Sequence, residues 1–175
     1  MRMVLGLAAV IVVLCAYLYW TAHRVERVHV RSASAFRALD QHLLRRAAAA
    51  AVVAEHTDNA ELYAAARLAL DAAPDGREAA ENDLSRQLAS VPLPPGDEAT
   101  RALVATSRRV TLARQVHTDT VRDALRARRR PVVRVFGLAR RYPRPAYFDI
   151  VEPVLPELPV VIAPRAQPAA AVEAA

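Results

Sequence analysis

An uncharged apolar run near the start of the chain limits what this sequence can fold into. Residues 3–22 read MVLGLAAVIVVLCAYLYWTA and hold no acidic or basic side chain. A helix of this length covers roughly 30 Å, which matches the hydrocarbon core of a bilayer. Tyr17, Tyr19 and Trp20 lie at its end, where such rings meet lipid headgroups. The run predicts a transmembrane anchor over residues 1–22, with these three rings as its membrane-interface belt.

A cleaved signal peptide is the alternative interpretation of the same run. Cleavage requires small residues at positions −3 and −1 of the cut site. A cut after Ala22 would place Trp20 at position −3, which is unsuitable. A retained anchor is therefore the favoured interpretation.

The orientation of the anchor follows from the arginines that flank it. Arg2 precedes the run, whereas four arginines follow it closely: Arg24, Arg27, Arg31 and Arg37. Cytoplasmic flanks carry the excess of positive charge in membrane proteins. The bias predicts a single-pass protein of the cell (plasma) membrane, with its N-terminus outside and its domain in the cytoplasm.

The rest of the chain is patterned for helices. Hydrophobic residues make up 54% of the sequence but aromatic residues only 5%, and there are four glycines. This apolar content is mostly Ala, Val and Leu, which favours an all-α fold. Apolar residues spaced by three and four predict helices over residues 23–56, 60–73, 77–90 and 98–130, with Asp58 as the cap of the second.

These helices predict the domain organisation. Helices separated by short breaks favour an antiparallel four-helix bundle, with coiled-coil-type packing, over residues 23–130. Residues 131–152 alternate arginines with apolar and aromatic residues, and we expect a short amphipathic, interfacial segment there. Residues 153–175 hold five of the twelve prolines and no helical pattern, which predicts a disordered tail rich in Pro and Ala.

Two segments resemble the LemA family of bacterial membrane proteins. Residues 40–46 (DQHLLRR) are similar to the family's D-x-Q-L-x-R-R. Residues 114–122 (RQVHTDTVR), Pro131, residues 136–138 (FGL) and residues 147–149 (YFD) are similar to its second motif. The resemblance covers the anchor and about half of the chain. It implies an N-terminal anchor on an antiparallel helical bundle and brings no catalytic residues.

Positive charge is concentrated toward the end of the predicted bundle. The net charge is +6, and residues 101–144 hold thirteen arginines against two acids. Clusters of this kind beside a membrane span bind anionic phospholipid headgroups. The proposed headgroup contacts are Arg126, Arg128, Arg129, Arg130, Arg134, Arg140 and Arg141. A solvated helix end that complements the helix dipole is an equally open interpretation. Nucleic acid is disfavoured as a partner, because no recognition motif or stacking platform accompanies the charge.

One short motif raises the alternative of an enzyme. Residues 77–82 (REAAEN) imitate the R-E-x-x-E-E core of a Nudix pyrophosphohydrolase, whose helical carboxylates hold a divalent metal. The upstream Glu and Gly of that motif are replaced by Ala69 and Tyr63, and Asn82 replaces its last Glu. We therefore expect a solvated helix face there. A degenerate Nudix-like enzyme on the residues 77–81 helix is kept as the alternative.

No other residue set points to catalysis or to a cofactor. The five histidines are never spaced by three or four and join no Cys or carboxylate cluster, which disfavours a metal site. His117 lies on an apolar stripe and is expected to be a packing residue. Asp40 and Asp119 could each meet an arginine across the bundle. The sequence predicts an interaction or scaffold protein without catalysis or cofactor, and leaves its membrane protein partner and oligomeric state unknown.

The anchor yields a direct expectation for the whole protein. It should remain in the membrane fraction at full length after washes with high salt and with alkaline carbonate, because the apolar span holds it in the bilayer. Fractionation followed by intact-mass measurement checks this. A soluble protein that starts near residue 23 would contradict it.

Overall fold

The computed structural model describes residues 1–94 and 96–151, and these residues form helices without any strand. The helices are α1 (Arg2–His56), α2 (Ala60–Asp71), α3 (Arg77–Ser90), α4 (Glu98–Arg129) and α5 (Pro131–Val135). The predicted all-α class is therefore confirmed for this part of the chain. The predicted tail, residues 153–175, lies outside the described residues.

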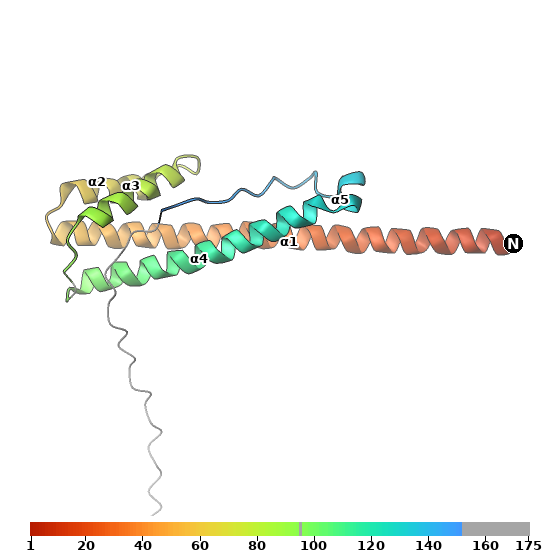
Figure 1. The fold of residues 1–175 in the computed structure, drawn as a ribbon, viewed down its shortest axis with the longest axis horizontal. Coiled ribbons are helices and arrows are strands. Elements are labelled where there is room, and N and C mark those ends of the chain that lie inside the picture. Colours follow the sequence, from red (N-terminus) through yellow and green to blue (C-terminus); the bar gives the residue numbers. More distant parts are fainter. Residues whose placement is uncertain (95, 152–175) are drawn as a thin grey trace, which may run out of the picture.

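Helix α1 is continuous from the apolar run into the rest of the fold (Figure 1). Its 55 residues contain no proline that would break the backbone hydrogen bonds. One stretch of the helix is long and apolar enough to cross a membrane, and none of that stretch is buried. Buried residues of α1 begin only at Thr21. The apolar run therefore projects alone up to its last two residues, and the packed part of the helix begins at Thr21.

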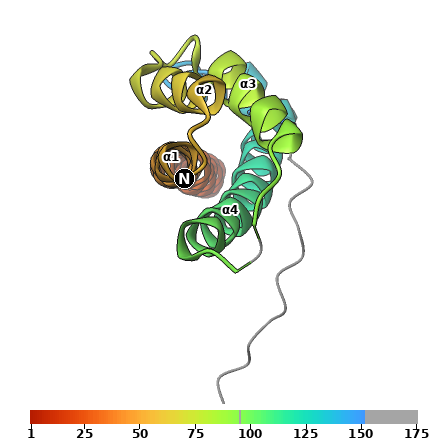
Figure 2. The same ribbon diagram turned by 90° about the vertical axis from the view of Figure 1, so that its left-hand side faces the viewer.

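The other helices are arranged on the packed part of α1. Helix α4 runs back along α1 in the opposite direction, whereas α2 and α3 form a short hairpin over the His56 end of α1 (Figure 1). Viewed along α1, the hairpin forms a second layer beside the α1–α4 pair (Figure 2). Helix α4 begins where the side chain of Asp97 accepts a hydrogen bond from the backbone of Thr100.

The cap of α2 differs from the sequence prediction. Asn59, and not Asp58, accepts the hydrogen bond from the backbone nitrogen of Leu62, at 2.9 Å. Asp58 instead adopts a positive φ of 49°. This left-handed conformation follows the end of α1. Asn59, whose backbone is extended, is therefore the residue that caps α2.

The hydrophobic core runs along the α1–α4 pair. At the His56 end it consists of Leu, Val and Ala from α1, α2, α3 and α4, as in Ala50, Leu62, Leu84 and Leu103. Buried polar residues accompany this core along its length. They are Thr21, His29, Ser32, His117 and Thr120 toward the apolar run, and Arg46, Glu81, Ser85, Thr100 and Ser107 nearer the His56 end. The largest apolar cluster lies at the distal end, where the hairpin covers the pair.

The chain from α5 to residue 151, within the segment predicted to be interfacial (residues 131–152), divides into two parts. Only α5 and the turns up to Tyr142 stay near the apolar run. The chain then extends back along the bundle, and Phe148 and Ile150 pack against Leu39 and other core residues of α1 and α4. The reason is hydrophobic, since this pairing buries two large side chains that would otherwise face water.

This extended segment also bears on the predicted four-helix bundle. Helix α3 contacts the segment through Asn82, whose side chain binds the backbone of Asp149 and of Val151. Part of the helical surface is therefore covered by extended chain. The antiparallel α1–α4 pair is as predicted, but a closed four-helix bundle is not confirmed.

A buried ion pair joins the hairpin to α1. Nη2 of Arg46 donates a hydrogen bond to Oε2 of Glu81 at 2.5 Å, and both side chains are inaccessible to solvent. Burial raises the pKa of Glu81, while the positive charge of Arg46 opposes the rise. Nearby, Arg77 contacts Asp40 at 3.2 Å. Two polar contacts thus set the position of α3 on α1.

The buried pair predicts a large loss of stability when one partner is neutralised. Glu81→Gln leaves Arg46 charged without a counter-ion in the core, which should lower the unfolding free energy by about 3–5 kcal/mol. The matched control is Asp83→Asn, because the exposed Asp83–Arg86 pair on the same helix should contribute less than about 1 kcal/mol. Denaturation of the detergent-solubilised protein, followed by circular dichroism, measures both. Equal losses would contradict the assigned role.

Candidate functional site

The end of the apolar run is the place where α1, the end of α4 and α5 meet. Val25 of α1 packs against Val133 of α5 and Ala139 of the following turn, with Leu138 and Tyr142 around them. Most of the proposed headgroup contacts therefore lie beside the first residues that follow the apolar run. The arginine-rich region and the apolar run are brought together by the antiparallel course of α4 (Figure 1).

Arg128 is part of the packing at this junction. Its Nη1 donates hydrogen bonds to Nε2 of His29 at 3.2 Å and to the backbone oxygens of Tyr142 and Pro143. His29 in turn donates from Nδ1 to the backbone oxygen of Val25, at 2.7 Å. Because Nδ1 donates, Nε2 is free to accept from the guanidinium. Arg128 thus fastens the turn after α5 to α1.

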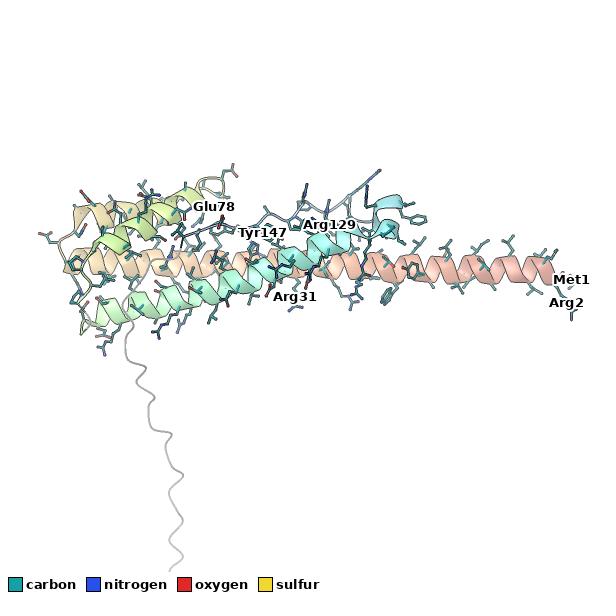
Figure 3. All side chains as sticks on the ribbon, viewed as in Figure 1. Met1, Arg2, Arg31, Glu78, Arg129 and Tyr147 are labelled. Carbon is teal, nitrogen blue, oxygen red and sulfur yellow. The ribbon has the colours of Figure 1, made fainter. Side chains whose placement is uncertain are left out.

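The other predicted headgroup contacts divide into two kinds. Arg126 and Arg141 form ion pairs with Asp123 and Glu26, at 3.7 Å and 3.6 Å. The remaining four are exposed: Arg129, Arg130, Arg134 and Arg140. Figure 3 shows Arg129 at the end of α4 where α5 begins. Arg126 and Arg141 are also largely exposed despite their ion pairs, so Arg128 is the one arginine of the predicted set that is held within the packing.

The three rings of the predicted interface belt lie on the exposed surface of α1. Tyr17, Tyr19 and Trp20 are each about half exposed or more. The ring centroids of Tyr17 and Trp20 are 6.4 Å apart, and the guanidinium of Arg24 lies 5.6 Å from the Trp20 ring. A belt of aromatic rings followed by a cation is the arrangement expected where an apolar helix leaves a bilayer.

The Nudix-like residues are used in contacts within the fold, so the expected solvated helix face is wrong for Glu81. Glu81 is buried against Arg46. Oε1 of Glu78 accepts a hydrogen bond from the backbone nitrogen of Asp149. Figure 3 shows Glu78 beside the extended chain at Tyr147. Sequence reasoning missed this role, because the partners lie up to 71 residues away along the chain.

Metal coordination finds no cluster to support it. Within residues 1–94 and 96–151, no group of three His, Cys, Asp or Glu side chains could hold a metal ion.

The two aspartates of the LemA-like segments make different contacts. Asp40 meets Arg77 across the fold, whereas Asp119 pairs with Arg122 on its own helix, at 3.1 Å.

A cavity of about 380 Å³ lies between α1, α4 and the start of the extended segment. Four rings line it, from His29 and Phe36 on α1, His117 on α4 and Tyr142. Phe36 lies 5.5 Å from His117, and His29 stacks on Tyr142 at 4.9 Å between ring centroids. The pattern of a single helix does not reveal this cavity. Only the antiparallel course of the two long helices indicates it, because that course brings His117 of α4 against Phe36 of α1.

His117 is buried as expected, with only 3% of its surface exposed, but its ring nitrogens lack well-formed hydrogen bonds. Neither ring nitrogen makes a hydrogen bond of good geometry with any residue that the structure describes. Burial lowers the pKa of His117, and the nearby backbone of Ala146 opposes this shift in part. The imidazole is therefore neutral near pH 7, with one donor and one acceptor at the cavity wall.

Comparison of this chain with protein-family models, with curated proteins and with solved structures finds no match.

The buried imidazole predicts a dependence of stability on pH. Because the pKa of His117 in the folded state lies below 6.5, its contribution is present above that pH and is lost as pH falls through the folded pKa. The melting temperature should fall between pH 7.5 and 5. The fall should be smaller in His117→Phe, whereas His42→Gln, at a partly exposed histidine of α1, should follow the wild type. Parallel curves for wild type and His117→Phe would contradict this assignment.

Proposed function

We propose that this chain is a single-pass protein of the cell membrane that acts as an interaction or scaffold protein, without catalysis. The observation that carries the proposal is the continuity of α1. One helix contains both the apolar run and the face on which α2, α3 and α4 are packed. Such a helix transmits the position of the anchor rigidly to the antiparallel helical bundle. The bundle then stands at a defined place on the membrane surface, where it is available to a membrane protein partner.

Contact with anionic phospholipids is the second part of the proposal. The exposed arginines Arg129, Arg130, Arg134 and Arg140 lie at the same end of the fold as the aromatic belt. A basic side chain beside an anionic leaflet contributes about 1 kcal/mol of binding free energy. Together these arginines would hold the end of α4 and α5 on the headgroups and limit the tilt of the bundle.

The orientation and the family remain proposals of the same kind. Four arginines close behind the apolar run favour a cytoplasmic domain with the N-terminus outside. Anionic lipid is concentrated on the cytoplasmic leaflet, which agrees with the headgroup contact proposed above. The relationship to the LemA family rests on the two sequence segments alone.

The alternative of a Nudix-like pyrophosphohydrolase has less support. Its carboxylates would have to be accessible to a metal ion and a pyrophosphate. Glu81 is instead inaccessible beside Arg46, and Glu78 binds the backbone of Asp149. Metal-dependent hydrolysis of nucleoside diphosphate derivatives by the purified protein, lost in Glu78→Gln, would favour this alternative.

The headgroup contact can be tested with the full chain in nanodiscs. Cys15 is the one cysteine of the sequence, so Cys15→Ser allows a single label to be placed at Val135→Cys on α5, where the side chain is 78% exposed. With anionic lipid, a spin label there should become less accessible to a water-soluble relaxation agent than in neutral discs. The reason is the attraction of the arginines to the charged surface.

The controls separate this attraction from general charge effects. A label at Val116→Cys, exposed on α4, should not respond to lipid charge. Replacing Arg129, Arg130 and Arg134 by Gln should abolish the response at residue 135. Replacing Arg67, Arg86 and Arg101, three exposed arginines at the distal end, removes the same charge and should leave the response intact. Equal accessibility of the label at residue 135 in both lipids would contradict the headgroup contact and favour a solvated helix end.

A further inference from the structure

The cavity between α1, α4 and residues 142–146 has no role in the function proposed above. Its walls are mostly apolar and include the rings of Phe36, His117 and Tyr142 together with Pro143 and Pro145. Its volume, about 380 Å³, lies within the ordinary range for sites that hold small organic molecules. Flat rings and prolines on several sides match the shape of an aromatic ligand better than that of a flexible chain.

The polar groups of the cavity indicate what else the ligand must carry. His117 is 3% exposed, and apart from a poorly formed contact of its ring with the backbone of Ala146, neither ring nitrogen has a hydrogen-bond partner among the described residues. The hydroxyl of Tyr142, also a lining residue, is buried and without a partner among the described residues. A buried donor or acceptor without a partner is costly, so a ligand that supplies one would gain affinity. A hydroxyl group meets this need, because it can both donate and accept.

The charge of the ligand follows from the same walls. The cavity walls formed by Phe36, Ala33 and Val30 are apolar and offer no counter-ion to an ionised group. The one lining arginine, Arg144, is exposed, so its charge stays in water. Arg128 is already occupied by His29 and two backbone oxygens. The cavity is therefore suited to an uncharged molecule.

The position of the cavity on α1 favours ligands that dissolve in membranes. His29 lies seven residues and Phe36 fourteen residues beyond Ala22, which corresponds to roughly 10–20 Å along the helix. In the proposed orientation the cavity is near the headgroups. Apolar aromatic molecules concentrate in the adjacent bilayer.

We propose that this cavity binds an uncharged aromatic molecule that carries a hydroxyl group, a phenol in chemical class, with the ring between Phe36 and the prolines and the hydroxyl paired to His117. This binding does not depend on the headgroup contact of the arginines.

Two probes of nearly equal shape test the proposal. 2-Naphthol carries the hydroxyl and naphthalene lacks it. Equilibrium dialysis against nanodiscs that hold the full chain, with empty nanodiscs subtracted, gives the saturable binding of each probe. The wild type should bind one 2-naphthol per chain, with a dissociation constant about tenfold lower than that for naphthalene, since only 2-naphthol satisfies His117. Equal affinities, or no saturable binding of 2-naphthol, would overturn the proposal.

Two variants locate the binding. His117→Phe keeps a ring of similar size without its nitrogens, so the two probes should then bind with equal affinity. Ala33→Trp places an indole in the cavity and should remove the saturable binding of both probes. Circular dichroism confirms that each variant retains its helices. A preference for 2-naphthol that survives in His117→Phe, or undiminished binding in Ala33→Trp, would place the ligand elsewhere and refute this site.

Discussion

The antiparallel packing of α4 against α1 is the constraint on which the other elements depend. The α2–α3 hairpin connects the two helices at one end, and α5 with its turn packs on α1 at the other. The extended segment lies along the same pair through Phe148 and Ile150. Because α1 is a single helix, the register of α4 decides which residues meet beside the apolar run. That register brings Arg128 to His29 and His117 to Phe36.

Much of the helical pattern could be predicted from sequence, since it depends on the spacing of apolar residues and on nearby turn residues. The stripes on α1 and α4 and the break at Pro74 are signals that act within a few residues. The features that the sequence did not reveal depend on distant partners. Nothing near Glu81 indicates Arg46, and nothing near Asp149 indicates Glu78 or Asn82. Glu78 and Glu81 of the Nudix-like motif thus make contacts whose partners come from other elements.

The candidate site shows the same division between local and distant signals. The local sequence predicted that arginines gather at the end of α4, but it could not distinguish Arg128 from its neighbours. Arg128 donates hydrogen bonds to His29 of α1 and to two backbone oxygens of the turn after α5, while Arg129 and Arg130 face solvent. The cavity lies where His29, Ser32 and Phe36 of α1 face His117 of α4. A pocket of this kind depends on two helices at once, and a single stripe cannot reveal it.

The uninterrupted course of α1 also has a mechanical consequence. Thirty-four residues separate Ala22 from His56, so the helix reaches roughly 50 Å beyond the end of the apolar run. Membrane helices tilt by about 20° on average, and the tilt follows the thickness of the bilayer. On a stiff arm of this length, a change in tilt of about 10° would move the α2–α3 hairpin sideways by about 9 Å. With α1 in a bilayer as proposed, a small change in its tilt would move the distal hairpin by about the width of a helix.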